Sequence, residues 1–185
     1  QPGAVARGYP DLHEHLETLD RAGLLVRVTR PINKDTELHP LVRWQFRGGI
    51  PEPQRKAFLF EHVVDGHGHR YAMPVAVGVL AASRQIYSLG MGCPVEEIGR
   101  RWQAARSRPI PPRLVDSGPV HEVVRTGAQL DEPYGGVDGL PVPISTPGFD
   151  IAPFITCWNW DTAAPETGVQ NIGNYRAHLK APRRV

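Results

Sequence analysis

The sequence has 185 residues, of which 41% are hydrophobic and 22% charged, as in an ordinary globular protein. This length allows one domain with a real core, or one domain and part of a second. The net charge of +2 is too small to indicate binding to nucleic acid or a membrane. No apolar run approaches the ~20 residues of a transmembrane helix, and the first residues show no secretory signal, so we expect a cytoplasmic protein.

Two amphipathic helices and a strand are predicted within the first 50 residues. Asp11 is suited to cap the first helix, and Gly23 to end it in the left-handed conformation. Residues 24–30 alternate between apolar and polar side chains, which is typical of a strand. Four apolar side chains of the second helix are expected to face inward: Leu38, Leu41, Val42 and Phe46.

The next segment predicts two strands and two helices. Residues 56–64 and 71–80 are strand-like and are joined by a polar turn. Residues 83–91 form a short helix in this interpretation, and residues 93–107 a second one that begins with Pro94. Alternating helices and strands predict an α/β fold for this part of the chain.

The second half of the chain has a different composition, with short β-type stretches between Gly, Pro and Asp residues. We expect the start of a β-rich unit there, with strands in these four segments: 120–127, 140–146, 154–160 and 168–180. The predicted organisation is a flexible N-terminus, an α/β domain, a Pro-rich connector and an incomplete β-rich domain, in this order: 1–10, 11–107, 108–119 and 120–185.

The cysteines and most histidines indicate structural roles. Cys93 and Cys157 have no metal or disulfide spacing, and we expect both to be buried thiols. The pair His67 and His69 could bind a metal, but no ligand cluster surrounds it, so a solvated turn is favoured. His13 and His15 are two residues apart on a predicted helix and are expected at the surface.

The segment "QNIGNYRAHLK" carries an amide, a glycine and a guanidinium on one predicted strand. Asn171 and Arg176 are five residues apart and would point to opposite faces of a regular strand. A bulge at Gly173 would bring them to one face, where Asn could bind Mg²⁺ or Mn²⁺ and Arg a carboxylate or phosphate. The alternative is a surface strand with a solvated arginine.

Several blocks of the sequence resemble the UbiD family of decarboxylases. The blocks are "DLHEHLETLDRAGLLVRV", "KAFLFEHV", "GLPVPIST", and "FITCWNW" followed by "TGVQNIGNYRAHLK", in the family's order. The last contains the pattern N-x-G-x-Y-R, which is the cofactor motif of the family. The resemblance covers nearly all of residues 11–185. It implies a β-rich second domain like the flavin-binding split barrel of these enzymes.

The resemblance implies a reaction, a cofactor and site residues. UbiD-like enzymes decarboxylate aromatic or α,β-unsaturated acids reversibly and without oxidation, using prenylated FMN, Mn²⁺ or Mg²⁺, and K⁺. Asn171 matches the family's metal ligand, and Arg176 matches the arginine that orients the substrate carboxylate and pairs with a catalytic Glu. The strand between them, Ile172, Gly173, Asn174 and Tyr175, would run along the cofactor. Thr156, Trp158 and Trp160 would contact the flavin or the substrate; for the tryptophans, core packing is the alternative.

One departure from the family concerns length. In UbiD-like enzymes the remaining metal ligands, a His and a Glu, the proton-donating Glu and a phosphate-binding Lys come after this motif. We therefore expect this chain to be incomplete and inactive alone, and to need the rest of the enzyme or a second chain. The family also implies a homo-oligomer. The alternative is a non-catalytic flavin-binding or structural subunit of a larger complex.

Overall fold

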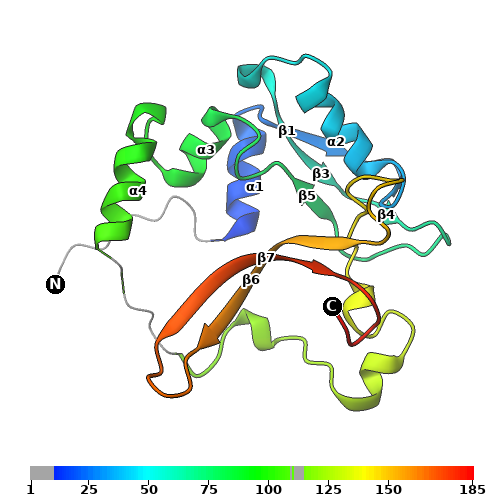
Figure 1. Cartoon of the computed structure of the whole chain (residues 1–185). Coiled ribbons are helices and arrows are strands. Elements are labelled where there is room, and N and C mark those ends of the chain that lie inside the picture. The colour runs from blue at the N-terminus through cyan, green and yellow to red at the C-terminus, as the bar shows by residue number, and fades with distance from the viewer. Residues whose placement is uncertain (1–10, 109, 111–114) are drawn as a thin grey trace. The chain divides into compact units, whose positions relative to one another are not determined.

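A computed structural model describes residues 11–108, 110 and 115–185 (Figure 1). The predicted flexible segment 1–10 and part of the predicted connector lie outside the described residues. The chain forms two compact units. Unit 1 contains residues up to 29, 42–61 and 75–123, whereas unit 2 contains 30–41, 62–74 and 124–185. Each unit is therefore built from segments that are far apart in the sequence.

Helix α1, Leu12–Arg21, has the predicted signals at both ends. The Asp11 carboxylate accepts a hydrogen bond from the backbone N–H of Glu14 at 2.9 Å, which satisfies one free donor of the first turn. Gly23 has φ +68°, where a residue with a Cβ is strained. These signals are local in sequence, and both are confirmed.

Unit 1 contains a three-stranded sheet of β1, Leu25–Val28, β3, Ala57–Phe60, and β5, Val75–Val77. β3 is the central strand, parallel to β1 and antiparallel to β5. The core of unit 1 joins residues of α1, of the sheet, of α3 and of the segments beside them: Leu19, Leu24, Leu25, Ala57, Leu59, Val79, Ala82 and Ile86. Burial of these side chains provides the main stabilisation of this unit.

Helices α3, Arg84–Met91, and α4, Ile98–Ser107, follow the sheet. The Ser83 hydroxyl caps α3 by accepting from the N–H of Ile86 at 3.3 Å, and Gly92 ends it at φ +59°. One 3-10 turn, Val95–Glu97, leads into α4, and another, Glu52–Gln54, precedes β3. These elements confirm the predicted α/β character of the first part of the chain.

Two of the four side chains of helix α2, Leu38–Arg47, that were predicted to face inward do not do so. The inward positions of α2 are Leu38, Val42 and Gln45, whereas Leu41 and Phe46 are exposed. Gln45 is buried because its side-chain amide bonds both the N–H and the C=O of Lys56, which replaces the apolar contact expected from Phe46.

His15 is buried, not exposed. Its Nε2 donates to the carbonyl oxygen of Val79 at 2.7 Å, which satisfies the polar ring in the core. Cys93 is buried as predicted, but Cys157 is exposed. Cys157 lies in the long strand 154–163, where most side chains are exposed, and the apolar character of its thiol is not enough to bury it.

Unit 2 contains two separate pairs of strands. β2, Ile32–Asn33, is parallel to β4, Val63–Val64, and β6, Phe154–Ala163, is antiparallel to β7, Gln170–His178. Figure 1 shows β6 and β7 as a long two-stranded ribbon. The predicted β structure at 154–160 and 168–180 is thus confirmed.

The other two predicted strands of the second half, 120–127 and 140–146, are wrong. Three 3-10 helices occupy much of this stretch, Pro119–His121, Gly127–Asp131 and Val137–Gly139, and residues 140–146 are irregular. Pro141 and Pro143 have no N–H to donate to a strand pair. The apolar residues of these two segments are compatible with a strand, but neither segment pairs with another strand of the described residues.

Candidate functional site

The β6–β7 hairpin carries every residue that the sequence predicted for the cofactor site. Its register is regular from Ala163 opposite Gln170 to Trp158 opposite Tyr175. The register then shifts, so that two residues of β6, Thr156 and Cys157, stand opposite Arg176. The predicted bulge at Gly173 is therefore wrong, because the extra residue is in the partner strand.

One face of this hairpin is aromatic. The rings of Trp158 and Trp160 are stacked, with centroids 5.8 Å apart. Gly173 pairs with Trp160, and a Cβ on it would lie 2.1 Å from Cε2 of the Tyr175 ring. Glycine thus leaves the space that the tyrosine ring fills. The face remains partly open to solvent, since the Tyr175 side chain is 60% exposed.

Asn171 belongs to this aromatic face by strand alternation, two residues before Gly173. It is exposed, and its backbone oxygen accepts a hydrogen bond from the Thr162 hydroxyl at 3.4 Å. Its side-chain amide is therefore presented beside the aromatic rings. An exposed amide oxygen at this place could be one ligand of a hard divalent metal.

The opposite face of β7 carries Ile172, Asn174 and Arg176. Asn174 donates to the Asn159 side chain at 3.5 Å, which confirms that these cross-strand partners share a face. The Arg176 guanidinium lies over the Phe154 ring, with Cζ 4.4 Å from the centroid, and its Nη1 is 3.9 Å from Asp150 Oδ1. In this structure Asn171 and Arg176 therefore lie on different faces of the strand.

A second polar cluster in unit 2 surrounds Asp65, and the sequence analysis did not find it. The Asp65 carboxylate accepts from the backbone N–H groups of His67 and His69, both at 2.9 Å, and from the hydroxyls of Tyr134 at 3.2 Å and Tyr71 at 3.5 Å. Burial raises the pKa of Asp65, but the donors outweigh it and the net pKa is lowered.

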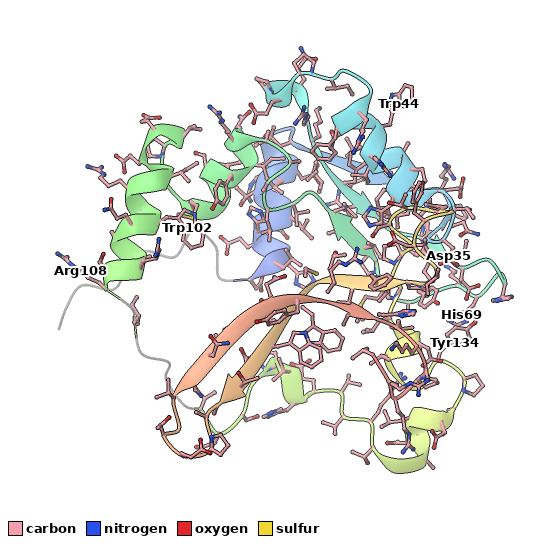
Figure 2. All side chains as sticks on the ribbon, viewed as in Figure 1. Asp35, Trp44, His69, Trp102, Arg108 and Tyr134 are labelled. Carbon is pink, nitrogen blue, oxygen red and sulfur yellow. The ribbon has the colours of Figure 1, made fainter. Side chains whose placement is uncertain are left out.

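Tyr134 closes this cluster and has the unusual backbone angle φ +59°. Its ring stacks on His69, with centroids 3.4 Å apart, and Figure 2 shows these two side chains side by side. Lys34 is buried nearby and pairs with Asp35 at 2.7 Å. All of these polar groups have partners, so the cluster holds the turn at 65–69 against the segment around Tyr134 and is structural in character. The predicted turn at His67 and His69 is confirmed.

The described part of the chain contains neither a cluster of metal-ligating side chains nor a membrane-spanning helix. Its side chains contain no group of three or more His, Cys, Asp or Glu residues that could hold a metal ion. None of the helices in residues 11–108 and 115–185 is both long and apolar enough to cross a bilayer. The candidate site is the hairpin, with its aromatic face, the Asn171 amide on that face and the Arg176 guanidinium on the opposite face.

Comparisons with known proteins point to one family. The model of the 3-octaprenyl-4-hydroxybenzoate carboxy-lyase N-terminal domain, UbiD_N, matches residues 16–106. Among solved structures, the chain resembles an evolved dimeric form of the UbiD-class enzyme HmfF from Pelotomaculum thermopropionicum in complex with prFMN. The identity is 30%, the TM-score 0.74, and the match covers 92% of this chain and 36% of that chain.

Two further structures have the same fold. The closed form of vanillic acid decarboxylase from Sedimentibacter hydroxybenzoicus matches with 26% identity and a TM-score of 0.74, over 96% of this chain and 36% of that one. A 3,4-dihydroxybenzoic acid decarboxylase from Enterobacter cloacae matches with 24% identity and a TM-score of 0.73, over 93% and 35%.

This chain spans about a third of the length of the solved enzymes that it matches. The matched part contains both the α/β elements and the hairpin that carries the N-x-G-x-Y-R pattern. The chain belongs to the UbiD family and corresponds to the N-terminal portion of its members.

Proposed function

We propose that this chain is the N-terminal part of a reversible, non-oxidative decarboxylase that acts on an aromatic or α,β-unsaturated carboxylic acid with prenylated FMN. The observation that carries the proposal is the N-x-G-x-Y-R segment on the exposed strand β7, which presents Asn171 and Tyr175 on an aromatic face and Arg176 on the opposite face. The solved HmfF structures, in complex with prFMN or FMN, support the flavin.

The hairpin fits a flavin through its open aromatic face. Trp158 and Trp160 offer a partly exposed π surface, and Gly173 leaves room beside them for the Tyr175 ring. Thr156, at the bulge, would donate a hydrogen bond to the cofactor. In this proposal β6 and β7 begin a split-barrel-like flavin domain, and strands from outside this chain complete it, because a two-stranded ribbon is marginally stable alone.

The metal is proposed at Asn171. An amide oxygen suits Mn²⁺ or Mg²⁺, which take several oxygen ligands. The described residues supply this one ligand and no acidic or histidine cluster around it. The rest of the shell, and the K⁺ site, therefore belong to the remainder of the enzyme or to a second chain, which also supplies the acid that donates the proton.

Arg176 is proposed to bind the substrate carboxylate. Its side chain is 59% exposed, and the guanidinium offers a planar fork of N–H donors that matches a carboxylate. Holding the carboxylate in one orientation favours departure of CO₂, because the breaking bond must be aligned with the acceptor of its electrons. The prenylated flavin, when bound, supplies the electron sink.

A non-catalytic flavin-binding or structural subunit is the alternative. The observation that favours it is that the described residues hold no group of three or more His, Cys, Asp or Glu side chains that could bind the metal. In either case we propose a cytoplasmic protein that forms a homo-oligomer.

Native mass spectrometry of the purified protein tests the proposal first. A species heavier than the 20.5 kDa chain that carries a prenylated flavin and Mn²⁺ would support it. A bare chain with no flavin would remove the enzyme interpretation for this molecule.

Two substitutions in the flavin-loaded enzyme containing this chain assign the roles. Arg176→Ala should lower kcat by about 10²-fold or more, because the substrate carboxylate is no longer oriented. Asn171→Ala should weaken metal binding by at least about tenfold, as measured by metal content after dialysis. Arg106→Ala and Gln103→Ala are controls at exposed positions outside the hairpin. Full activity of Arg176→Ala would exclude its role.

A further inference from the structure

Asp150 is fixed by the tight loop that precedes β6. Its Oδ2 accepts from the backbone N–H of Thr146 at 2.9 Å, and its own N–H donates to the carbonyl oxygen of Thr146 at 2.9 Å. The side chain is 16% exposed. The carboxylate therefore has one oxygen bound to the loop and the other, Oδ1, directed at a neighbour.

That neighbour is Arg176. Asp150 Oδ1 lies 3.9 Å from Arg176 Nη1, and in the described part of the chain Asp150 is the single ion-pair partner of this arginine. The centroid of the Phe154 ring lies 4.4 Å from Cζ of the guanidinium, and the same ring stacks on His178, with the two centroids 4.8 Å apart. Two contacts of different kinds thus limit the guanidinium.

The length of the ion pair is informative. A charge-assisted hydrogen bond between nitrogen and oxygen is about 2.7–2.9 Å long, so at 3.9 Å Asp150 attracts the guanidinium without occupying its N–H groups. The donors remain available to another carboxylate. A long, flexible side chain on an exposed strand would otherwise sample many rotamers.

We propose that Asp150 is a positioning residue for Arg176, holding the guanidinium over the Phe154 ring so that its free N–H groups face the substrate carboxylate. This inference rests on the proposed function for the identity of the bound carboxylate. The restraint of Arg176 by Asp150 is independent of the proposed function, because both residues belong to this chain.

The first experiment measures the restraint of the Arg176 side chain and does not depend on enzyme activity. In NMR spectra of the chain, the Phe154 ring should shift the Arg176 side-chain protons away from free-arginine values. Asp150→Asn keeps an oxygen for the Thr146 N–H but loses the charge, and should return these protons toward free-arginine values. Asp161→Asn, an exposed carboxylate of the same hairpin, should leave them unchanged. Unshifted protons in the unsubstituted chain, or no response to Asp150→Asn, would overturn the proposal.

The second experiment measures turnover in the flavin-loaded enzyme that contains this chain. Asp150→Asn should lower kcat by at least about tenfold, because a misplaced guanidinium orients the carboxylate poorly. KM should not rise in proportion, since removal of a negative charge beside Arg176 favours binding of an anion. Asp150→Glu, which keeps the charge, should recover part of kcat, and flavin content should stay constant.

The outcomes separate the two proposals. If kcat of Asp150→Asn is unchanged and KM falls, Asp150 only reduces the charge of Arg176, and positioning is excluded. If the unsubstituted enzyme binds flavin but decarboxylates no aromatic or unsaturated acid, the proposed function fails and the catalytic meaning of the ion pair fails with it. The NMR result then still decides whether Asp150 restrains Arg176.

Discussion

The sheet of unit 1 and the β6–β7 hairpin of unit 2 are both built from β-strands, but they use their side chains in opposite ways. The sheet is packed with apolar residues, and Ile86 beside it is 0% exposed. In the hairpin, Ile172 is 70% exposed, and most side chains of both strands are open to solvent.

The comparison indicates which strands stabilise this chain and which strands leave their side chains open to a ligand. Buried apolar surface stabilises the sheet and its helices. The hairpin has little such burial, and its residues are available to a ligand or to further protein. Sites that bind ligands are often in the less stable parts of a fold. The N-x-G-x-Y-R segment is in such a part.

A matched pair of substitutions tests this contrast with the largest expected effect. Ile86→Ala should lower the free energy of unfolding by about 2–5 kcal/mol, because it leaves a cavity in the core. Ile172→Ala removes the same atoms from an exposed position and should change it by less than about 0.5 kcal/mol. Urea unfolding followed by circular dichroism measures both. Equal losses would show that the exposed face of the hairpin is covered in solution.

A substitution in the polar cluster around Asp65 should change the free energy of unfolding by an amount between those expected for Ile86→Ala and Ile172→Ala. Asp65→Asn keeps one carbonyl oxygen but loses the charge and an acceptor for the tyrosine hydroxyls. Since Asp65 is 7% exposed, we expect a loss of about 1–3 kcal/mol in the free energy of unfolding at pH 7. Asp161→Asn, at an exposed carboxylate, is the control.

The pH dependence of this effect has a defined sign. The folded pKa of Asp65 is below its ordinary value, so its stabilising contribution is present above the unfolded pKa, about 3.9. The contribution is lost as the pH falls from there through the folded pKa. Unfolding curves measured from pH 6 to pH 2 should thus converge for the Asp65→Asn variant and the unsubstituted chain. A constant difference between them would contradict the assignment.

The parts of the fold that were predictable depend on neighbours in sequence. The ends of α1 were predicted because Asp11 and Gly23 lie beside the helix that they cap. The burial of His15 was not, because its partner, the carbonyl of Val79, is 64 residues away. The sequence around His15 shows the helix but gives no sign of that acceptor.

The same difference applies to the site. The hairpin strands and the N-x-G-x-Y-R residues were predicted from a local pattern. The bulge was placed at Gly173, although the extra residue lies in β6, because register is a property of two strands. Asp150 and Tyr134 were missed for a similar reason. Asp150 lies 26 residues before Arg176, and Tyr134 lies 69 residues after Asp65.

Gly173→Ala is expected to have the smallest effect on stability and a specific effect on the site. The new Cβ would meet the Tyr175 ring, which is exposed and can rotate away. Alanine in a strand gains about 0.5–1 kcal/mol over glycine, which offsets the lost ring contact, so the net change in the free energy of unfolding should stay below about 1 kcal/mol. Urea unfolding of both chains measures this change.

The position of the ring then distinguishes a structural glycine from one that shapes the site. Nuclear Overhauser contacts between the Tyr175 ring and the backbone of residue 173 should disappear in Gly173→Ala, and flavin affinity of the loaded enzyme should fall. In a Tyr175→Ala background the same substitution should leave flavin affinity unchanged, because there is no ring to displace. If Gly173→Ala lowers affinity equally in both backgrounds, the glycine serves direct approach of the flavin to the backbone and not placement of the tyrosine ring.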